Sequence, residues 1–159
     1  MRVSVLTISD SVAAGKYDDR SGPAVAARCT ELKWEVVSTA TLADERIAIE
    51  AFLKKAADAG EGAVDLILTT GGTGVGPRDV TPEATQAAIE RLIPGFAEHM
   101  RAEGRKSTER ALLSRGITGI RAKTIIINLP GSPTGAVESL NAIAPLLPHA
   151  VDVVHGARH

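Results

Sequence analysis

A glycine-rich segment at residues 69–85 combines small, hydroxyl-bearing and acidic side chains in a pattern suited to phosphate chemistry. It contains Gly-Gly-Thr-Gly at 71–74 and then an acid, Asp79, followed by Val-Thr-Pro-Glu-Ala. An apolar run at 64–68 precedes it and a helical pattern at 83–93 follows it. Strand, glycine loop and helix in this order are typical of a phosphate site.

This segment fits neither of the common phosphate-binding patterns. A dinucleotide fingerprint that starts at Gly72 would need glycine at position 77, which is proline. A P-loop that starts at Gly71 would need lysine and then serine or threonine at 77 and 78, which are proline and arginine. We therefore expect a different kind of site, with Asp79 at its end.

The composition describes an ordinary globular protein and excludes several classes. The 159 residues are 44% hydrophobic and 23% charged, which predicts one domain over residues 1–159. A net charge of −1 and an aromatic content of 3% argue against a nucleic-acid binder. Cys29 is the one cysteine and is most simply a packing residue, so no intrachain disulfide can form. Without a signal peptide or a membrane-spanning run, we expect a cytoplasmic protein and no membrane partner.

Strand patterns alternate with helical patterns along the chain. This alternation predicts an α/β fold in three layers, α/β/α, with a mostly parallel central sheet. Residues 9–22 are expected as a loop and 107–116 as a turn or short helix. The strands are expected at 3–8, 34–39, 64–69, 118–121 and 124–128, and the helices at 23–32, 43–59, 83–93, 96–104, 134–147 and 148–156.

Three of the expected strands end in small, polar or glycine-proline segments. These segments are Ser9-Asp10-Ser11, residues 70–74 and residues 128–133. Ligands of parallel α/β sheets bind beyond the carboxyl ends of the strands. If the three ends share one edge of the sheet, they form a single pocket lined by backbone N–H and hydroxyl groups.

These segments together resemble the molybdopterin adenylyltransferase family, of the MogA/MoaB type that includes the G domain of gephyrin. The resemblance extends over nearly the whole chain. It rests on Ser9-Asp-Ser11, Asp19-Arg-Ser-Gly22, Gly71-Gly-Thr-Gly74, Arg78-Asp-Val-Thr-Pro-Glu-Ala84 and Asn128-Leu-Pro-Gly-Ser-Pro133. These segments fall at the three strand ends described above, and three such motifs in this order are far more specific than one glycine loop.

The resemblance implies a reaction in molybdenum cofactor biosynthesis. Such enzymes join the terminal phosphate of molybdopterin to the α-phosphate of ATP and release pyrophosphate. The resemblance also implies Mg²⁺, because two polyanions must be brought together. It further suggests a homotrimer and a molybdenum insertase as a partner that receives the product.

The same resemblance assigns roles to individual residues. Asp44 and Asp79 are expected to take part in catalysis and to hold Mg²⁺. The residues expected to bind the pterin and nucleotide are Ser9, Asp10, Ser11, Gly71, Gly72, Thr73, Gly74, Ser114, Pro130, Gly131, Ser132 and Pro133.

Local structure could also account for the two acids and the glycines. Asp44 could simply cap the helix that follows it. Asp79 could be a loop acid favoured by the dipole of the next helix, although Thr81, before Pro82, is the better N-cap. The glycines could form a tight turn that binds no ligand.

Other polar residues give weaker signals. Lys16, Arg20, Arg78 and Arg115 are candidates for neutralising phosphate, although most surface cations are merely solvated. The four histidines, His99, His149, His155 and His159, do not have metal-ligand spacing, which argues against zinc chemistry.

Two other functions remain open from the sequence. One is a molybdopterin-binding or assembly protein of the same fold that has lost catalysis. The other is an unrelated nucleotide-binding module. Both Asp44 and Asp79 are present, which favours the enzyme.

Overall fold

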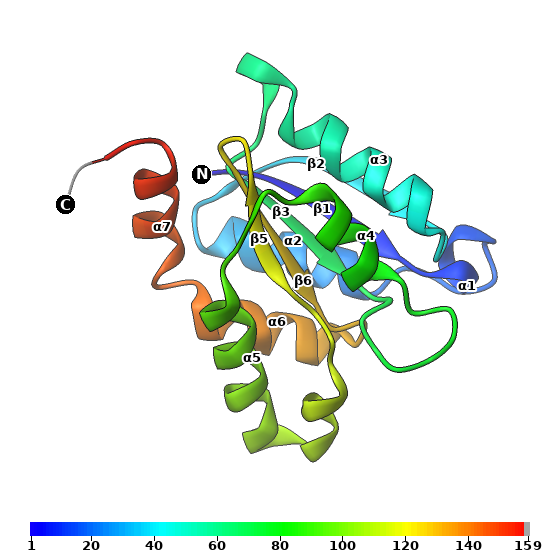
Figure 1. Cartoon of the computed structure of the whole chain (residues 1–159). Helices are drawn as coiled ribbons and strands as arrows, with labels where there is room; N and C mark the ends of the chain where they lie inside the picture. Colours follow the sequence, from blue (N-terminus) through cyan, green and yellow to red (C-terminus); the bar gives the residue numbers. More distant parts are fainter. Residues whose placement is uncertain (158–159) are drawn as a thin grey trace.

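The computed structural model describes residues 1–157, so His159 and the end of the expected domain lie outside the described residues. Six strands and nine helical segments, two of them short 3-10 helices, alternate along this part of the chain (Figure 1). The strands are β1 (Arg2–Ile8), β2 (Glu35–Leu42), β3 (Leu66–Thr70), β4 (Arg91–Leu92), β5 (Thr118–Arg121) and β6 (Thr124–Leu129). The helices are α1 (Asp10–Ala13), α2 (Ser21–Glu31), α3 (Arg46–Ala57), η1 (Gly60–Gly62), α4 (Thr81–Ala88), α5 (Pro94–Ser107), η2 (Glu109–Leu113), α6 (Pro133–Ile143) and α7 (Leu147–Val154).

The strands form one sheet in the order β2-β1-β3-β6-β5-β4. The first four strands in this order are parallel, and β5 and β4 extend the sheet antiparallel. The mostly parallel sheet predicted from the sequence is therefore confirmed. Because β1, β3 and β6 are neighbours and parallel, their carboxyl ends lie together on one edge.

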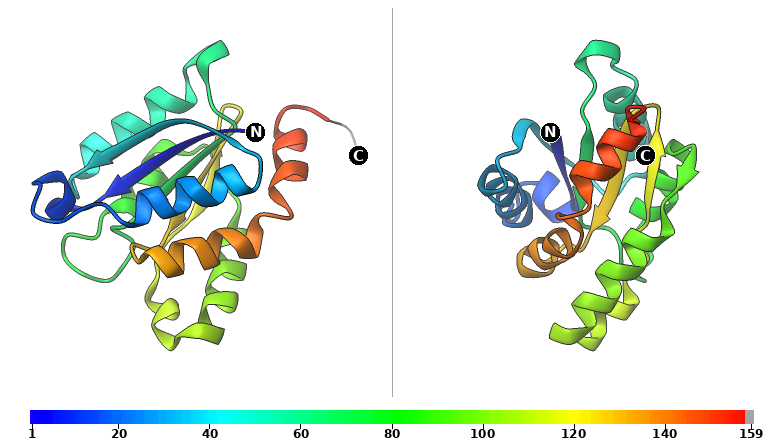
Figure 2. Two further views of the ribbon diagram at one scale, coloured as in Figure 1. Left: turned by 180° about the vertical axis from the view of Figure 1, so that it is seen from behind. Right: turned by 90° about the vertical axis from the view of Figure 1, so that its left-hand side faces the viewer.

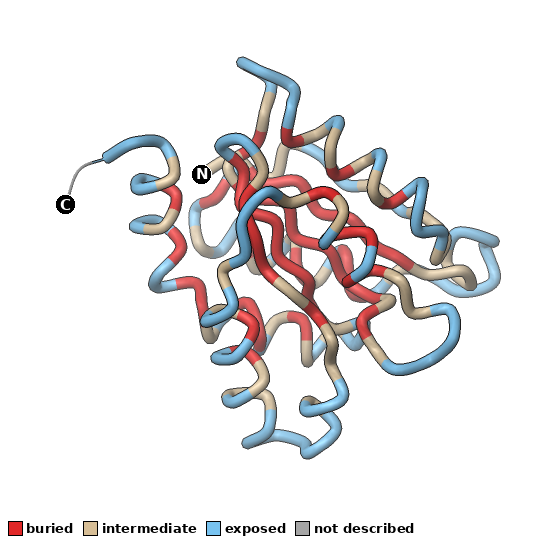
Figure 3. Tube along the Cα trace, viewed as in Figure 1, coloured by how far each residue is buried: buried red, intermediate tan, exposed pale blue. Residues whose placement is uncertain are grey.

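Side chains that alternate along the central strands divide the core between the two faces of the sheet. Leu66 and Leu68 pack with side chains from α2, α5, α6 and α7, whereas Ile67 packs with α3 and α4. Figure 1 shows α3 and α4 in front of the sheet, and the rear view in Figure 2 shows α2 and α6 across the other face. The buried residues concentrate in the strands between these layers (Figure 3). This is the expected three-layer arrangement.

Two expected elements differ from the structure near the first strand. The segment after β1, expected as a loop, begins with the short helix α1, because the Ser9 hydroxyl accepts a hydrogen bond from the Val12 N–H at 3.3 Å. Helix α2 begins at Ser21 rather than at Pro23, and Asp19 accepts a hydrogen bond from the Gly22 N–H at 3.0 Å. Polar side chains thus organise a stretch with little helical pattern.

The helix expected at 83–93 is wrong at both ends. It begins at Thr81 and ends at Ala88, since Ile89 has extended backbone angles. Arg91 and Leu92 then pair with β5 as the edge strand β4. Pairing with a distant strand outweighs a local helical pattern here.

Helix α5 is longer than expected and runs through Gly104 to Ser107. Gly104 does not end it, and a Cβ atom there would lie 3.0 Å from the Ala111 side chain on η2. Within residues 1–157, no helix is long and apolar enough to cross a membrane.

Candidate functional site

Hydrogen bonds join the loop after β3 to the loop after β6, and they join the loop after β1 to the end of β2. The Thr70 hydroxyl donates to the Pro130 carbonyl at 2.6 Å, and the Gly71 N–H donates to the Leu129 carbonyl at 3.3 Å. The Ser9 N–H donates to the carbonyl of Leu42, at the end of β2, at 2.9 Å. The prediction that the three loops share one edge of the sheet is therefore confirmed.

Asp10 and Asp44 form a reciprocal pair. The Asp10 N–H donates to Asp44 Oδ2 at 2.9 Å, and the Asp44 N–H donates to Asp10 Oδ1 at 3.0 Å. Arg78 adds two hydrogen bonds to the Asp10 carboxylate and one to Glu45. Both Asp10 oxygens thus have partners within the protein, and they orient the start of α1, Asp44 and the loop around Arg78.

Asp44 lies half-buried at the centre of an acidic cluster. Burial is the main cause that raises its pKa, and the negative charges of Asp10 and Asp79 raise it further. The hydrogen bond from the Asp10 N–H and the charge of Arg78 oppose this rise. The two acids expected to be catalytic are therefore close enough to interact, and a cation between them would be stabilised.

Asp44 is not a helix cap. The N-cap position of α3 belongs to Glu45, and no side chain makes a capping hydrogen bond there. Thr81 is likewise not an N-cap but the first residue of α4, with Val80 before it. The Thr81 hydroxyl instead donates to the Gly71 carbonyl at 2.9 Å, which fixes the start of the glycine loop.

Glycine is required at 71 and 72 for two reasons. Both residues have positive φ angles, 103° and 62°, which side chains disfavour. A Cβ atom at Gly71 would collide with the Ile8 carbonyl, and one at Gly72 would lie 2.7 Å from Asp44 Oδ1 and collide with the Thr81 hydroxyl. The main chain thus approaches the acid as closely as it can.

Asp79 makes two hydrogen bonds to Gly76 within the second half of the glycine loop, residues 74–79. Its Oδ2 accepts a hydrogen bond from the Gly76 N–H at 2.8 Å, and its own N–H donates to the Gly76 carbonyl at 3.1 Å. A Cβ atom at Gly74 would lie 2.8 Å from the same oxygen. Asp79 therefore has a structural role in the loop, which the sequence did not reveal, and its Oδ1 has no such bond among the described residues.

Two clefts meet at this loop. The first has a volume of about 400 Å³ and is lined by Asp44, Gly71 and the segment 18–21. The second, of about 330 Å³, lies between the glycine loop, η2 and the start of α6. The residues that line both clefts are Gly72, Asp79 and Gly131. The loop and Asp79 therefore form a wall with a cleft on each side.

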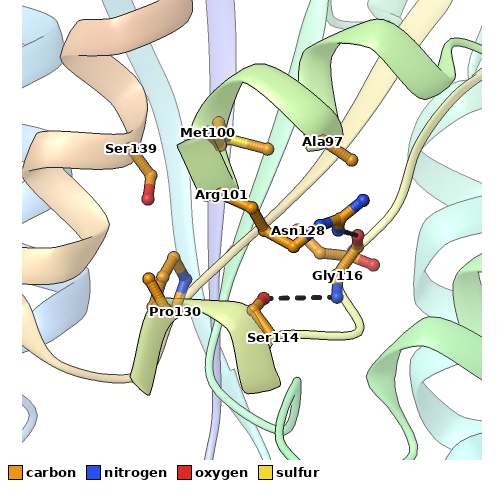
Figure 4. A pocket seen from close by; sticks show the side chains of 9 residues that line it. Ala97, Met100, Arg101, Ser114, Gly116, Asn128, Pro130 and Ser139 are labelled. Carbon is orange, nitrogen blue, oxygen red and sulfur yellow. Dashed lines mark hydrogen bonds between the residues drawn. The ribbon is translucent and has the colours of Figure 1, made fainter. Parts of the chain in front are cut away.

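A small, mostly apolar void of about 30 Å³ lies next to the second cleft and shares Ser114 with it (Figure 4). Its lining includes Ser139, and Gly116 donates its N–H to the Ser114 hydroxyl at 3.3 Å. Arg101 donates to the Gly116 carbonyl at 3.1 Å.

Nearly every residue expected from the sequence lines a cleft. The expected residues that line the first cleft alone are Ser9, Asp44, Gly71 and Pro133, and those that line the second alone are Thr73, Gly74, Ser114, Pro130 and Ser132. Gly72, Asp79 and Gly131 line both clefts. Asp10 and Ser11 lie outside both linings. The Ser132 hydroxyl also caps α6 by accepting from the Gly135 N–H at 3.2 Å.

Several cleft residues were not expected from the sequence. Helix α6 contributes Glu138 and Ser139, and the segment around η2 contributes Thr108 and Arg110. These residues belong to no sequence motif. They reach the cleft because α5 and η2 pack against α6, and the sequence alone gives no signal of this packing. In the first cleft, Asp18, Asp19 and Ser21 were not assigned to the site from the sequence, although two of them belong to the Asp-Arg-Ser-Gly segment. Arg20, in the same segment, was expected as a candidate for neutralising phosphate and does line this cleft.

Comparisons with known proteins point to one family. Residues 4–149 match the family described as "Probable molybdopterin binding domain". The chain is 42% identical over 163 residues to the molybdopterin adenylyltransferase of Helicobacter pylori J99, covering 98% of this chain and 89% of the relative. It is 38% identical to the Escherichia coli K12 enzyme of the same name, covering 98% and 79%. The chain belongs to the molybdopterin adenylyltransferase family.

Solved structures of this family have the same fold. The molybdopterin biosynthesis enzyme MoaB from Thermus thermophilus superimposes with a TM-score of 0.91 at 46% identity, covering 98% of this chain and 97% of the other. The Mog protein from Mycobacterium ulcerans gives 0.88 at 36% identity, covering 96% and 97%. The resemblance inferred from the three motifs is thereby confirmed over nearly the full chain.

The donor set of this candidate site fits Mg²⁺. No group of three or more His, Cys, Asp or Glu side chains could hold a metal within the part of the chain that the structure describes. Mg²⁺, however, is commonly held by one or two carboxylates together with substrate phosphates and water. The first cleft carries four carboxylates, from Asp18, Asp19, Asp44 and Asp79, against the single cation of Arg20. A polyphosphate would meet net negative charge there unless a divalent cation accompanied it.

Proposed function

We propose that this protein is a molybdopterin adenylyltransferase that acts in molybdenum cofactor biosynthesis. The terminal phosphate oxygen of molybdopterin attacks the α-phosphorus of ATP. One new P–O bond forms, the bond from the α-phosphorus to the β-phosphate breaks, and pyrophosphate leaves with its electrons. The product is adenylylated molybdopterin.

The observation that carries this proposal is the wall shared by the two clefts. Asp79 lines both, and Asp44 lies beside it in one of them. A reaction between two substrates needs a place where both reacting groups meet, and holding them there contributes much of the rate enhancement. An arrangement with one acid on the shared wall and another next to it supports phosphoryl chemistry between two bound molecules.

The chain's own groups have distinct tasks in this proposal. The N–H groups of the glycine loop, at Gly72, Thr73 and Gly74, donate to phosphate oxygens. Asp44 is presented by its reciprocal pair with Asp10, which leaves Oδ1 directed toward Gly72. Asp79 is presented by the Gly76 N–H. These contacts fix both carboxylates before substrate arrives, so little reorganisation is needed.

Asp44 and Asp79 would together hold the Mg²⁺ that accompanies ATP. When bound, the ion supplies positive charge that offsets the charge on the transferring and leaving phosphates. The negative charges of Asp10 and Asp79, which help to raise the pKa of Asp44, would favour a cation beside that carboxylate. The same proposal places the protein in the cytoplasm, as a single domain that forms a homotrimer and passes its product to a molybdenum insertase. The solution mass of the purified protein would test the trimer.

The direct experiment is a coupled assay of pyrophosphate release with purified molybdopterin, ATP and Mg²⁺. We expect release that requires both substrates and yields adenylylated molybdopterin by mass spectrometry. Omitting either substrate is the control. Binding of molybdopterin without any release of pyrophosphate would contradict the proposal and support a non-catalytic binding protein.

A further inference from the structure

Arg115 binds the glycine loop from the segment that follows η2. Its Nε donates to the Gly74 carbonyl at 2.7 Å, and its Nη2 donates to the Asp79 carbonyl at 2.7 Å. Its guanidinium also pairs with the carboxylate of Glu83, on α4. Every nitrogen of the guanidinium therefore donates to a protein oxygen.

These contacts close residues 74–79 into a ring. Gly74 and Asp79 stand at the two ends of the loop, and one planar group bridges their carbonyls. Inside the ring, the Gly76 N–H donates to the Asp79 carboxylate at 2.8 Å. Glu83 holds the guanidinium from the opposite side, so the group is fixed between α4 and the loop. The position of the Asp79 carboxylate therefore depends on the Arg115 side chain.

The earlier part of the glycine loop is held independently of this side chain. Gly71 is bound through its carbonyl by the Thr81 hydroxyl, and Gly72 through its carbonyl by the Thr81 N–H at 3.1 Å. Thr73 is bound through its carbonyl by the backbone N–H of Arg115 at 2.8 Å, which any residue except proline at 115 keeps. Changing the side chain at 115 thus loosens Asp79 and leaves the N–H groups at 72 and 73 in place.

We propose that Arg115 is a positioning residue for Asp79 and that it acts by bridging the two ends of the 74–79 loop. This inference rests on the proposed adenylyl transfer. The sequence suggested a different role, in which Arg115 neutralises phosphate by its charge. The two roles differ in what they require. Neutralisation needs a positive charge, whereas bridging two carbonyls needs the planar fork of arginine.

The test compares Arg115→Lys and Arg115→Gln with the wild-type protein in the pyrophosphate assay. Lysine keeps the charge but lacks the planar fork, so its single nitrogen cannot reproduce the arrangement in which Nε and Nη2 donate to two carbonyls while Nη1 pairs with Glu83. We expect kcat to fall about 10- to 100-fold in both variants, the scale of a displaced catalytic group. KM for molybdopterin should stay near the wild-type value, because the first half of the loop is unchanged, and KM for ATP should change less than kcat.

Arg121→Gln is the matched control. Arg121 also pairs with one carboxylate, that of Asp58, and with one main-chain carbonyl, that of Ala88. It lies on β5 and lines neither cleft. We expect this variant to lose thermal stability as the Arg115 variants do while keeping the wild-type kcat.

Hydrogen exchange gives a readout that does not depend on turnover. The amides of Gly76 and Asp79 should exchange faster in Arg115→Gln than in Arg121→Gln. Glu83→Gln, which weakens the anchor of Arg115 by removing its charge and does not touch the loop, should show the same change to a smaller extent. This variant also serves if Arg115→Gln does not fold.

Four results would overturn the inference. They are wild-type kcat in Arg115→Lys, a rise in KM without loss of kcat, equal loss of kcat in Arg121→Gln, and unchanged exchange at Gly76 and Asp79. An inactive wild-type protein would instead contradict the proposed adenylyl transfer, so the two failures are distinguishable.

Discussion

Gly72 is where the main chain approaches the Asp44 carboxylate most closely. In Gly72→Ala, the added methyl group would lie 2.7 Å from Asp44 Oδ1 and collide with the Thr81 hydroxyl. The positive φ of 62° adds backbone strain. We expect the free energy of unfolding to fall by about 2–3 kcal/mol and adenylylation to be lost, measured by urea denaturation and by pyrophosphate release.

Gly60→Ala is the control for this prediction. Gly60 has the same φ of 62°, but a Cβ atom there would have no neighbour within 4 Å. The substitution should therefore lower the free energy of unfolding only by the backbone strain, about 1–2 kcal/mol, and leave pyrophosphate release unchanged. If the two variants behaved alike, the close approach of Gly72 to Asp44 would have no functional meaning.

The sequence predicted which residues meet at the site better than it predicted what they do there. The motifs identified Asp79 and the glycines, and the family resemblance identified Asp44, for which a helix cap was an equally natural role from the sequence alone. The tasks of Asp10 and Arg115 could not be predicted, because they depend on partners 34 and 41 residues away in the chain. A local pattern holds no information about such contacts.

At the scale of elements, Asn128 connects β6 to its neighbours. This buried amide donates to the hydroxyls of Thr69, on β3, at 3.0 Å and Thr85, on α4, at 2.9 Å. Its oxygen accepts from the Ile117 N–H at 3.2 Å. Asn128 thus holds the strand, the helix and the start of β5 in register beneath the clefts.

Asn128→Ala should leave these buried groups without partners. We expect the free energy of unfolding to fall by about 3 kcal/mol, measured by urea denaturation. Asn141, an exposed asparagine on α6 that accepts from Arg28 at 2.6 Å, is the matched control. Asn141→Ala should change stability by less than about 0.5 kcal/mol. Equal effects of the two substitutions would show that the buried network contributes nothing.

The long apolar strands were predictable because burial on both faces gives a continuous run of apolar residues. Two short elements were not predictable. Helix α1 depends on a single capping hydroxyl, that of Ser9. Strand β4 depends on pairing with β5, almost thirty positions further along the chain. Each contains too few residues for periodicity to show.

At the scale of the whole molecule, the reactivity of the Cys29 thiol reports how tightly helix α2 packs on the sheet. The residue is fully buried, and burial raises the pKa of its thiol to about 11. The thiolate is the reactive form, so both access and ionisation oppose modification near pH ~8. We expect no reaction with Ellman's reagent in the native protein and one thiol per chain after denaturation in guanidinium. Rapid reaction of the native protein would contradict this packing.

The fold as a whole places two clefts on either side of one loop, and the proposed reaction depends on Asp79 in that loop. The most direct measurement follows label from [α-³²P]ATP into molybdopterin with the wild-type protein and with Asp79→Asn. Asparagine can still accept the Gly76 hydrogen bond, so the loop should keep its shape. We predict that labelling is abolished while molybdopterin binding, measured by calorimetry, is retained. Labelling by Asp79→Asn at the wild-type rate would contradict the assignment of this carboxylate to adenylyl transfer.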